Sequence, residues 1–233
     1  MQNVNRRLQE ALENKSTYCY DNGVLINNLD IKDQKELDCI EASITYLALN
    51  KLMLENQDFK FDVIYYLNIH KAIFSSIYPF AGDIRMENIT KDNTPFCRPE
   101  YIVNYLSYLL EEMENKSRRI KSIDEYITFL AHYYSELNLV HPFREGNGRT
   151  LREFLRQMVE YLNKYLSFEP LELDYSKVDD VLRKKLIDGS RIAATTDDIT
   201  LLKEFFTGVL SYKEKINIRV LCQIVLVDNK FDK

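Results

Sequence analysis

The pattern of apolar and polar positions along the chain is mostly that of amphipathic helices. Apolar residues recur at spacings of three, four and seven, as they do on the buried face of a helix. Within residues 34–56, for example, Leu37, Ile40, Ile44 and Leu47 form one such stripe. The same pattern predicts helices over residues 62–77, 100–116, 122–137 and 150–166, a polar amphipathic helix over 1–15, and at least two more within 171–213.

The segment from Tyr78 to Pro99 interrupts the helical pattern and holds three of the five prolines. Ile84, Met86 and Ile89 alternate in a way that predicts a short strand, and the polar residues that follow, 91–93, favour a turn. We therefore expect a small hairpin or loop lying on a helical body. Two further segments leave the pattern: a turn-rich entry segment and an apolar, β-branched end that the pattern does not place, residues 16–31 and 216–227.

The composition fits one folded domain. Of 233 residues, 45% are apolar and 29% are charged, which excludes a mostly disordered or collagen-like chain. The 6 glycines are few for a turn-rich β fold, since average usage predicts roughly 16. A net charge of −5 argues against a protein that coats nucleic acid through bulk charge.

The cysteines and the chain's apolar runs bear on its location. Cys19, Cys39, Cys97 and Cys222 include no CxxC pair, so we expect free thiols in a reducing cytosol. The first fifteen residues lack the apolar run of a secretory signal. The longest apolar run, near residues 220–227, is far shorter than the ~20 residues of a membrane span. We therefore expect a cytoplasmic protein without a membrane partner or direct nucleic-acid binding.

Residues 141–152, which read HPFREGNGRTLR, carry the candidate chemistry. A Gly-Asn-Gly turn that opens a helix directs several backbone N–H groups outward and can bind an anion. Arg149, Arg152 and Arg156 follow in the first turns of that helix, where the helix dipole disfavours cations. A bound polyphosphate would offset this cost, and so would local carboxylates such as Glu145 and Glu153.

Glu145 and His141 each have two interpretations. Glu145, beside a polyphosphate site, is a natural Mg²⁺ ligand, because Mg²⁺ is usually held by one or two carboxylates plus phosphate oxygens. Alternatively, it is a helix N-terminal charge or an ion-pair partner. His141 could accept a proton near neutral pH, or it could be a surface group. Together with the glycines and arginines, the two residues are typical of a nucleotide-transfer site. His70 and His132, by contrast, lie in apolar helical patterns and are expected to be packing residues.

The same segment resembles the Fic motif, HxFx(D/E)GNGRxxR, at every defined position. Residues 78–85, residues 94–96, Glu41-Ala42 and Ile69-His70 also resemble the family. The resemblance implies an all-α Fic-type helical bundle with a small β-hairpin flap. It covers roughly residues 18–210, so we expect a Fic domain over 18–213, an N-terminal helical extension over 1–17 and a C-terminal tail over 214–233.

The resemblance also implies an activity. Fic enzymes of this motif class mostly transfer AMP from ATP to a Tyr, Ser or Thr hydroxyl of a target protein and release pyrophosphate. In this chain His141 would deprotonate the target hydroxyl, and Glu145 would hold a Mg²⁺ that bridges the α- and β-phosphates. Arg149 and Arg152 would neutralise the β- and γ-phosphates, and Phe143 would pack the loop onto the core. The remaining nucleotide-binding residues would be Asn138, Gly146, Asn147, Gly148 and, in the flap, Lys91.

The flap over residues 84–96 would bind the target. By the resemblance, it would pair with the target's backbone as an extra strand and so fix the register of the modified hydroxyl. The flap positions expected to contact the target are Ile84, Met86, Thr94 and Phe96. Family targets include small GTPases, type II topoisomerases and chaperones, and self-modification is common. By analogy, a bacterial toxin acting on topoisomerases fits this short chain better than a secreted effector does.

Many Fic proteins carry an inhibitory motif, (S/T)xxxE(G/N), whose glutamate pairs with the second motif arginine, here Arg152. This chain has no full match: Ser107 with Glu111 and Thr200 with Glu204 both fail at the last position. We therefore expect a small antitoxin that supplies the glutamate in trans, with a degenerate internal motif or an unregulated enzyme as alternatives.

Three other functions compete with AMP transfer. In the Doc branch of the superfamily, which transfers phosphate to proteins, a lysine replaces the second glycine of the motif; here Gly148 is present. Transfer of another group, such as UMP or phosphocholine, is a second alternative. The third is a Fic-shaped binding module without turnover, against which the intact histidine, glutamate and arginines argue.

Overall fold

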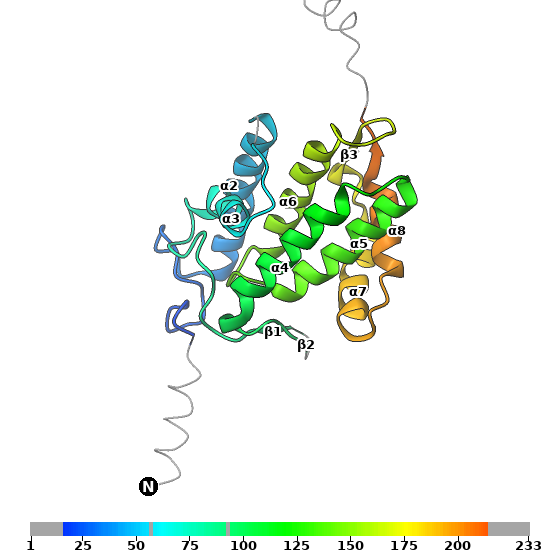
Figure 1. Ribbon diagram of the computed structural model, residues 1–233. Helices are drawn as coiled ribbons and strands as arrows, with labels where there is room; N and C mark the ends of the chain where they lie inside the picture. Colours follow the sequence, from blue (N-terminus) through cyan, green and yellow to red (C-terminus); the bar gives the residue numbers. More distant parts are fainter. Residues whose placement is uncertain (1–15, 56–57, 92–93, 214–233) are drawn as a thin grey trace, which may run out of the picture.

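Helix α5, Ile123–Val140, is the central element of the fold, because it packs against helices α4, α6, α7 and α8. The computed structural model describes residues 16–55, 58–91 and 94–213. The other helices in those ranges are α2 (Gln34–Leu54), α3 (Val63–Phe74), α4 (Pro99–Ser117), α6 (Asn147–Leu162), α7 (Asp180–Thr196) and α8 (Thr200–Val209), with one 3-10 turn, Tyr175–Lys177. Figure 1 shows α2 and α3 on one side of α4, α5 and α6, with α7 and α8 on the other.

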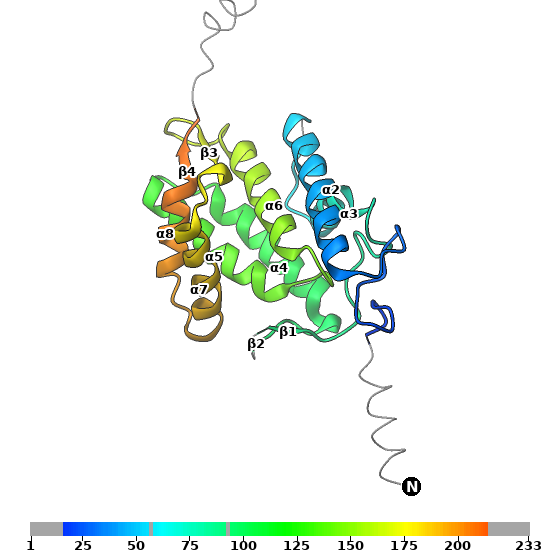
Figure 2. The ribbon, with the colours of Figure 1, turned by 180° about the vertical axis from the view of Figure 1, so that it is seen from behind.

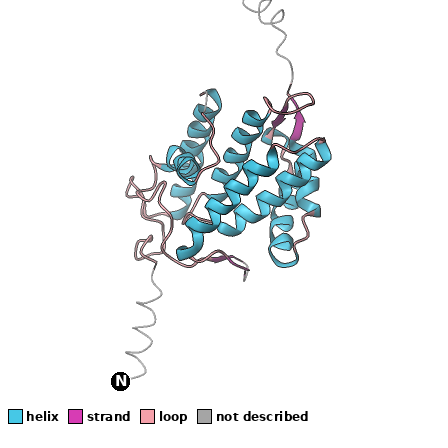
Figure 3. Ribbon diagram, viewed as in Figure 1, coloured by secondary structure: helices cyan, strands magenta, loops and turns pink. Residues whose placement is uncertain are grey.

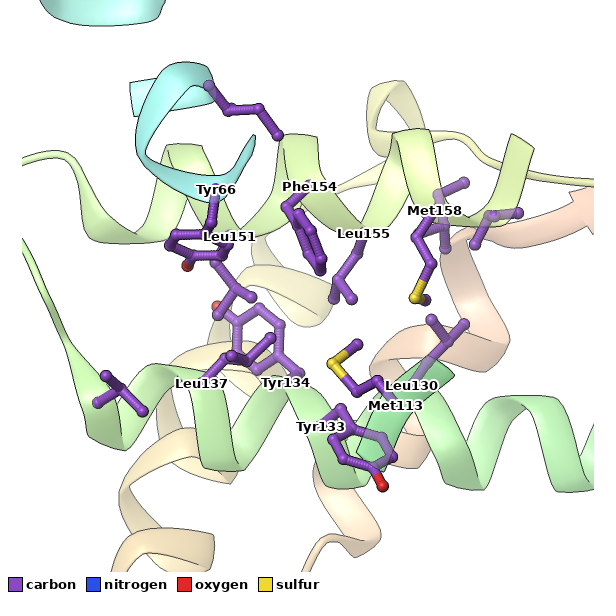
Figure 4. Packing of buried hydrophobic residues seen from close by; sticks show 14 of the residues in the cluster. Tyr66, Met113, Leu130, Tyr133, Tyr134, Leu137, Leu151, Phe154, Leu155 and Met158 are labelled. Atoms are coloured by element: carbon purple, nitrogen blue, oxygen red, sulfur yellow. The ribbon is translucent and has the colours of Figure 1, made fainter. Parts of the chain in front are cut away.

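The core lies between α4, α5 and α6. Met113 of α4, Leu130 of α5 and Leu155 of α6 are each fully buried, and Figure 4 shows their side chains meeting in the space between the three helices. Phe154 of α6 extends this core toward Tyr66 of α3, with ring centroids 5.1 Å apart. This packing fixes the two helices, α5 and α6, that flank the candidate site.

Helix starts follow the local sequence. Asp33, Asp62, Ser122 and Asp179 each precede a helix, and each side chain accepts a hydrogen bond from a backbone N–H in the first turn. Such a cap satisfies one of the donors that a helix end leaves unpaired. The predicted helices are therefore confirmed within a few residues, whereas the predicted helix over 1–15 and the apolar segment over 216–227 lie outside the described residues.

The expected hairpin is present but starts later than the alternation predicts. Strand β1, Thr90–Lys91, pairs antiparallel with β2, Thr94–Pro95, at the lower edge of the bundle in Figures 1 and 2. The strand predicted from Ile84 and Met86 is wrong, because residues 84–89 are not in a strand, and only the Ile89 carbonyl joins the hairpin, by accepting from the Phe96 N–H at 3.2 Å. There the backbone bonds elsewhere: the Arg85 N–H donates to the Pro142 carbonyl at 2.9 Å.

A second small sheet joins the end of the described chain to the core. Strand β3, Leu171–Leu173, pairs antiparallel with β4, Leu210–Tyr212, and Figure 3 shows the pair as magenta arrows at the upper end of the helical bundle. Leu171 and Leu173 are buried on its inner face. The sequence pattern did not predict this sheet, because its two strands are short and distant in the sequence.

Two features bear on compartment. None of the helices in the described ranges is long and apolar enough to cross a membrane. The three cysteines that the structure describes, Cys19, Cys39 and Cys97, are free thiols, and Cys222 lies outside the described residues.

Candidate active site

Helix α5 ends at the candidate catalytic residue. His141 is the C-terminal cap of α5 and has left-handed backbone angles, φ 45° and ψ 59°. The chain then crosses to Gly146, whose φ of 81° is also left-handed and caps the start of α6. A left-handed residue at each end turns the loop sharply between the two helices. The loop over residues 141–146, called the motif loop below, is therefore fixed between two core helices.

Asn147 and Phe143 hold the loop from inside. The Asn147 side chain donates to the Phe143 carbonyl at 2.8 Å and accepts from the Phe143 N–H at 2.9 Å. The Phe143 ring is fully buried and stacks on His70, with centroids 3.7 Å apart. The predicted packing role of Phe143 matches this geometry, and Asn147 contributes its side chain to the loop itself.

His70 also supports the loop through its ring nitrogens. The Gly82 N–H donates to His70 Nδ1 at 2.8 Å, so Nδ1 is unprotonated. The other nitrogen, Nε2, must then carry the proton, and it donates to the Glu145 carbonyl at 3.0 Å. Burial lowers the pKa of His70 to about 4, which keeps this neutral tautomer. The prediction that His70 is a packing residue is confirmed, and it packs against the motif loop. His132 is half-buried, with its ring 4.8 Å from that of Tyr133.

The ring of His141 is oriented with one nitrogen free. Its Nδ1 lies 3.0 Å from the Asn138 carbonyl, which can only accept, so Nδ1 carries the proton. Nε2 is then unprotonated. Burial lowers the pKa of His141 to about 4, so the ring is neutral at pH 7. The Phe96 ring stacks on the imidazole, with centroids 3.8 Å apart and planes at 14°. The geometry is that of a general base with a fixed tautomer.

A cavity of about 550 Å³ opens beside this ring. It lies within the range of small-molecule sites. The residues that line it come from α5, the motif loop, the start of α6, the hairpin and α7: Lys91, Phe96, Tyr134, Asn138, His141, Arg144, Glu145, Gly146, Asn147, Gly148, Arg152, Leu186, Ile187, Asp188, Ser190, Arg191 and Ala194. Most of the predicted nucleotide-binding residues are therefore brought together in one cavity.

The cavity favours an anion. Lys91, Arg144, Arg152 and Arg191 line it against two carboxylates, those of Glu145 and Asp188. The N-terminus of the 16-residue helix α6 also faces it, and its backbone N–H groups carry partial positive charge. The described residues give Arg152 no salt-bridge partner; its side chain hydrogen-bonds to the hydroxyl of Tyr134.

Arg149 does not line the cavity. Its Nη2 lies 2.5 Å from Glu41 Oε1 on α2 and 3.5 Å from Glu145 Oε1, and its guanidinium lies 4.7 Å from the centre of the Phe74 ring. The Tyr78 hydroxyl donates to the other oxygen of Glu41. For Arg149, local carboxylates therefore offset the cost of a cation at the helix start.

The same holds for Arg156, the third arginine of α6. Its guanidinium pairs with Glu153 at 2.8 Å and with Glu160 at 3.2 Å. Of the three arginines, Arg152 alone lines the cavity. Local carboxylates therefore compensate Arg149 and Arg156, whereas Arg152 lines the cavity that could bind a polyphosphate.

The predicted flap residues divide similarly. Phe96 and Lys91 line the cavity. Ile84 is half-buried and Met86 is 80% exposed, and both precede the hairpin without lining the cavity. Thr94 pairs with Lys91 across the hairpin. Phe96, predicted to contact the target, and Lys91, predicted to contact the nucleotide, thus both reach the cavity.

Helix α7 supplies site residues that no motif in the sequence indicates. Asp188, Ser190 and Arg191 line the same cavity as the motif loop. The helical pattern predicted α7, but no local signal connects these residues to a motif some forty positions earlier. The long-range packing of α7 on α5 brings them there.

Glu145 is suited to a magnesium ion. Its side chain is 43% exposed toward the cavity, and Oε1 accepts from the Gly146 N–H at 2.8 Å, which leaves lone pairs of the carboxylate open. In the described part of the chain no three His, Cys, Asp or Glu side chains cluster as a metal site. A Mg²⁺ bound by one carboxylate and by phosphate oxygens needs no such cluster, so the residues present fit the ion.

Comparisons with known proteins agree with the motif. The sequence model described as Fic/DOC family matches residues 60–159. Protein adenylyltransferase VbhT of Bartonella schoenbuchensis is 34% identical over 152 residues, which cover 64% of this chain and 32% of VbhT. Probable protein adenylyltransferase y4lH of Sinorhizobium fredii is 32% identical over 67% of this chain and 77% of its own length. Probable protein adenylyltransferase Fic of Escherichia coli is 26% identical over 85% and 94%.

Solved structures show the same fold. BepC of Bartonella tribocorum, crystallised with AMPPNP, superposes with a TM-score of 0.73 at 21% identity, over 84% of this chain and 97% of BepC. The N-terminal Fic domain of a Bartonella quintana effector, crystallised with ADP, also gives 0.73, at 23% identity, over 84% and 95%. The helical bundle with a hairpin is therefore the Fic fold, as the sequence predicts.

Proposed function

Because the chain belongs to the Fic/DOC family, we propose that it is a protein adenylyltransferase that moves AMP from ATP to a Tyr, Ser or Thr hydroxyl of a target protein. The observation that carries the proposal is the unprotonated Nε2 of His141 beside a cationic cavity at the start of α6. Relatives named protein adenylyltransferase, at 26% to 34% identity, support the same reaction.

His141 performs the proton transfer in this mechanism. Its Nε2 accepts the proton of the target hydroxyl while Nδ1 stays bonded to the Asn138 carbonyl. The hydroxyl oxygen attacks the α-phosphorus, the bond from that phosphorus to the bridging oxygen breaks, and pyrophosphate leaves with the electron pair. Fixing the tautomer in advance orients the base, and positioning of this kind contributes much of the rate enhancement in phosphoryl transfer.

The phosphates are bound by the start of α6. Gly146, Asn147, Gly148 and Arg152 line the cavity, and in the proposal the backbone N–H groups of Asn147 and Gly148 and the guanidinium of Arg152 neutralise phosphate charge there. The Gly146 N–H donates instead to the Glu145 carboxylate. Arg149 acts through Glu145 and Glu41 rather than by direct contact. Asn138 and Lys91 line the same cavity and are proposed nucleotide contacts.

Glu145 would hold the Mg²⁺ that accompanies ATP. Such an ion would supply positive charge against the phosphates of ATP. The half-exposed carboxylate of Glu145 lies beside the N-terminus of α6, where it would be available as a ligand.

The flap is the proposed binding site of the target protein. Phe96 and Lys91 sit at the cavity, so a strand of the target paired with the hairpin would present its hydroxyl near His141. A type II topoisomerase or a GTPase stays the expected target, self-modification stays a prediction, and so does a bacterial cytoplasmic location.

Regulation by an antitoxin is also proposed. Arg152 has no carboxylate partner among the described residues, so a glutamate supplied in trans could pair with it and block the γ-phosphate. Titration of the enzyme with a co-encoded small protein tests this: loss of labelling is expected, and unchanged labelling would leave the toxin–antitoxin pair without support.

Two labels distinguish the possible reactions. The protein is incubated with Mg²⁺ and a bacterial lysate, once with α-labelled and once with γ-labelled ATP, beside His141→Ala. Protein label from the α-position alone, lost in the variant, is the expected result. Label from the γ-position would indicate a Doc-like kinase. Label from neither ATP, with label from UTP or CDP-choline, would indicate transfer of another group, and no label from any donor would indicate a binding module.

A further inference from the structure

Arg85 is a buried cation without an ion pair. Its side chain is fully buried, and within the described residues no carboxylate lies at salt-bridge distance from it. Burial lowers the pKa of Arg85 from its ordinary value. An uncompensated buried charge is strongly destabilising, so the surrounding groups must compensate for it.

Backbone carbonyls provide the compensation. Nε donates to the His141 carbonyl at 2.8 Å, and Nη1 donates to the Glu87 carbonyl at 2.6 Å. Nη2 donates to the carbonyls of Cys97 and, at 3.5 Å, Val140. One planar guanidinium thus binds four backbone oxygens from three separate segments.

Two of these oxygens belong to the end of α5. The last carbonyls of a helix lack partners inside the helix and carry its partial negative charge, so a cation there is favourable. Arg85 binds the carbonyls of Val140 and His141 at the point where the backbone turns left-handed. Left-handed backbone angles are unfavourable for a residue other than glycine, so these bonds help to hold His141 in a disfavoured conformation.

The other two oxygens belong to the two ends of the hairpin. Glu87 precedes β1 and Cys97 follows β2. The Cys97 N–H also donates to the Leu139 carbonyl at 3.0 Å. Phe96, next to Cys97, stacks on the His141 ring. Arg85 therefore binds both ends of the hairpin and also the backbone of the residue that carries the imidazole.

We propose that Arg85 is a positioning residue that couples the flap to the orientation of His141. The inference rests on the proposed function, since it concerns the base of that reaction. Lysine cannot replace the guanidinium, because the three donors of its ammonium lie on one nitrogen. The planar guanidinium has donors on three nitrogens and so can reach carbonyls of separate segments at once. Arg85 acts through the backbone and contacts neither nucleotide nor target.

Histidine NMR tests the proposal without relying on activity. The chain has three histidines, so nitrogen-15 spectra of histidine-labelled protein can resolve each ring. In the wild type, His141 should show the Nδ1–H tautomer and His70 the Nε2–H tautomer. In Arg85→Lys we expect His141 to populate both tautomers, while His70 keeps its own and serves as an internal reference.

Kinetics provide the second readout. In Arg85→Lys, transfer of α-label to protein should fall about 100-fold, as expected for a small misplacement of a reacting group, while AMPPNP affinity by calorimetry stays unchanged. Arg156→Lys is the matched control, because it also replaces the guanidinium of a mostly buried arginine, one that binds Glu153 away from the cavity. In this variant His141 and His70 should each keep the wild-type tautomer, and transfer of the label should be unchanged.

Each outcome decides something. An unchanged His141 tautomer with normal transfer would make Arg85 merely structural and overturn the proposal. If Arg85→Lys fails to fold, Arg85→Gln, which removes the buried charge, is examined instead; failure of both variants would assign Arg85 to the fold and also overturn it. If the tautomer changes but the wild type labels no protein, the positioning role holds and the proposed function falls.

Discussion

Replacing Gly146 by alanine tests how tightly the motif loop is packed. Gly146 has a φ of 81°, and a Cβ placed on it would lie 2.3 Å from both Cε2 and Cζ of Phe74. Phe74 is fully buried in α3, so its ring has little room to retreat. The alanine variant therefore combines backbone strain with steric overlap against the core.

The two penalties can be sized separately. A left-handed alanine costs about 1–2 kcal/mol relative to glycine. Forcing an extra methyl group into a packed core costs about 1–3 kcal/mol. Together they predict a loss of about 2–5 kcal/mol in the free energy of unfolding. At about 2–4 °C per kcal/mol for a chain of this size, Tm should fall by about 4–20 °C.

Urea unfolding and thermal melting of Gly146→Ala and the wild type measure this loss. Gly148→Ala is the matched control for stability, because its Cβ would meet only the Arg152 Nη1, at 3.2 Å, and that group is the end of a flexible side chain. Alanine in a helix is favoured over glycine by about 0.5–1 kcal/mol, so Gly148→Ala should not lose stability. A Gly146→Ala protein as stable as the wild type, or equal losses in both variants, would refute the packing argument.

Three further predictions follow from the site. The pKa of His70 and of His141 is about 4 in the fold and about 6.5 unfolded, so the stability that each neutral ring contributes is full above pH 6.5 and falls as pH drops toward 4; urea unfolding at several pH values should show this decline, and a flat profile would contradict it. Glu41→Gln leaves Arg149 with a weaker partner and should cost about 1–3 kcal/mol in urea unfolding, whereas unchanged stability would mean that the pair contributes nothing. Arg152→Ala should weaken ATP binding by about tenfold or more and AMP binding little, in calorimetry; equal losses would remove Arg152 from the γ-phosphate.

Local signals predicted most of the helices. Capping residues such as Asp33 and Ser122 act within a few positions, and the apolar stripes repeat along each helix, so the helix bounds were found within a few residues. The alternation of Ile84 and Met86 places the start of the hairpin several residues too early in the sequence. The pattern resembles a strand, but the backbone there bonds to the motif loop instead. The β3–β4 sheet joins segments far apart in the sequence and left no local signal.

Local sequence alone brings the candidate residues of the site together. His141, Glu145 and the Gly-Asn-Gly turn lie within a few residues, so their spacing and the left-handed turn at Gly146 bring them to one helix N-terminus in any fold that forms α6.

The packing of the helices selected the residues that surround that turn. It assigned Arg149 to Glu41 and left Arg152 facing the cavity, although the two arginines are three residues apart. It also brought α7 to the cavity and placed Arg85 under His141. These contacts join residues distant in the chain, and their partners are selected by how the helices pack, which a local pattern does not encode.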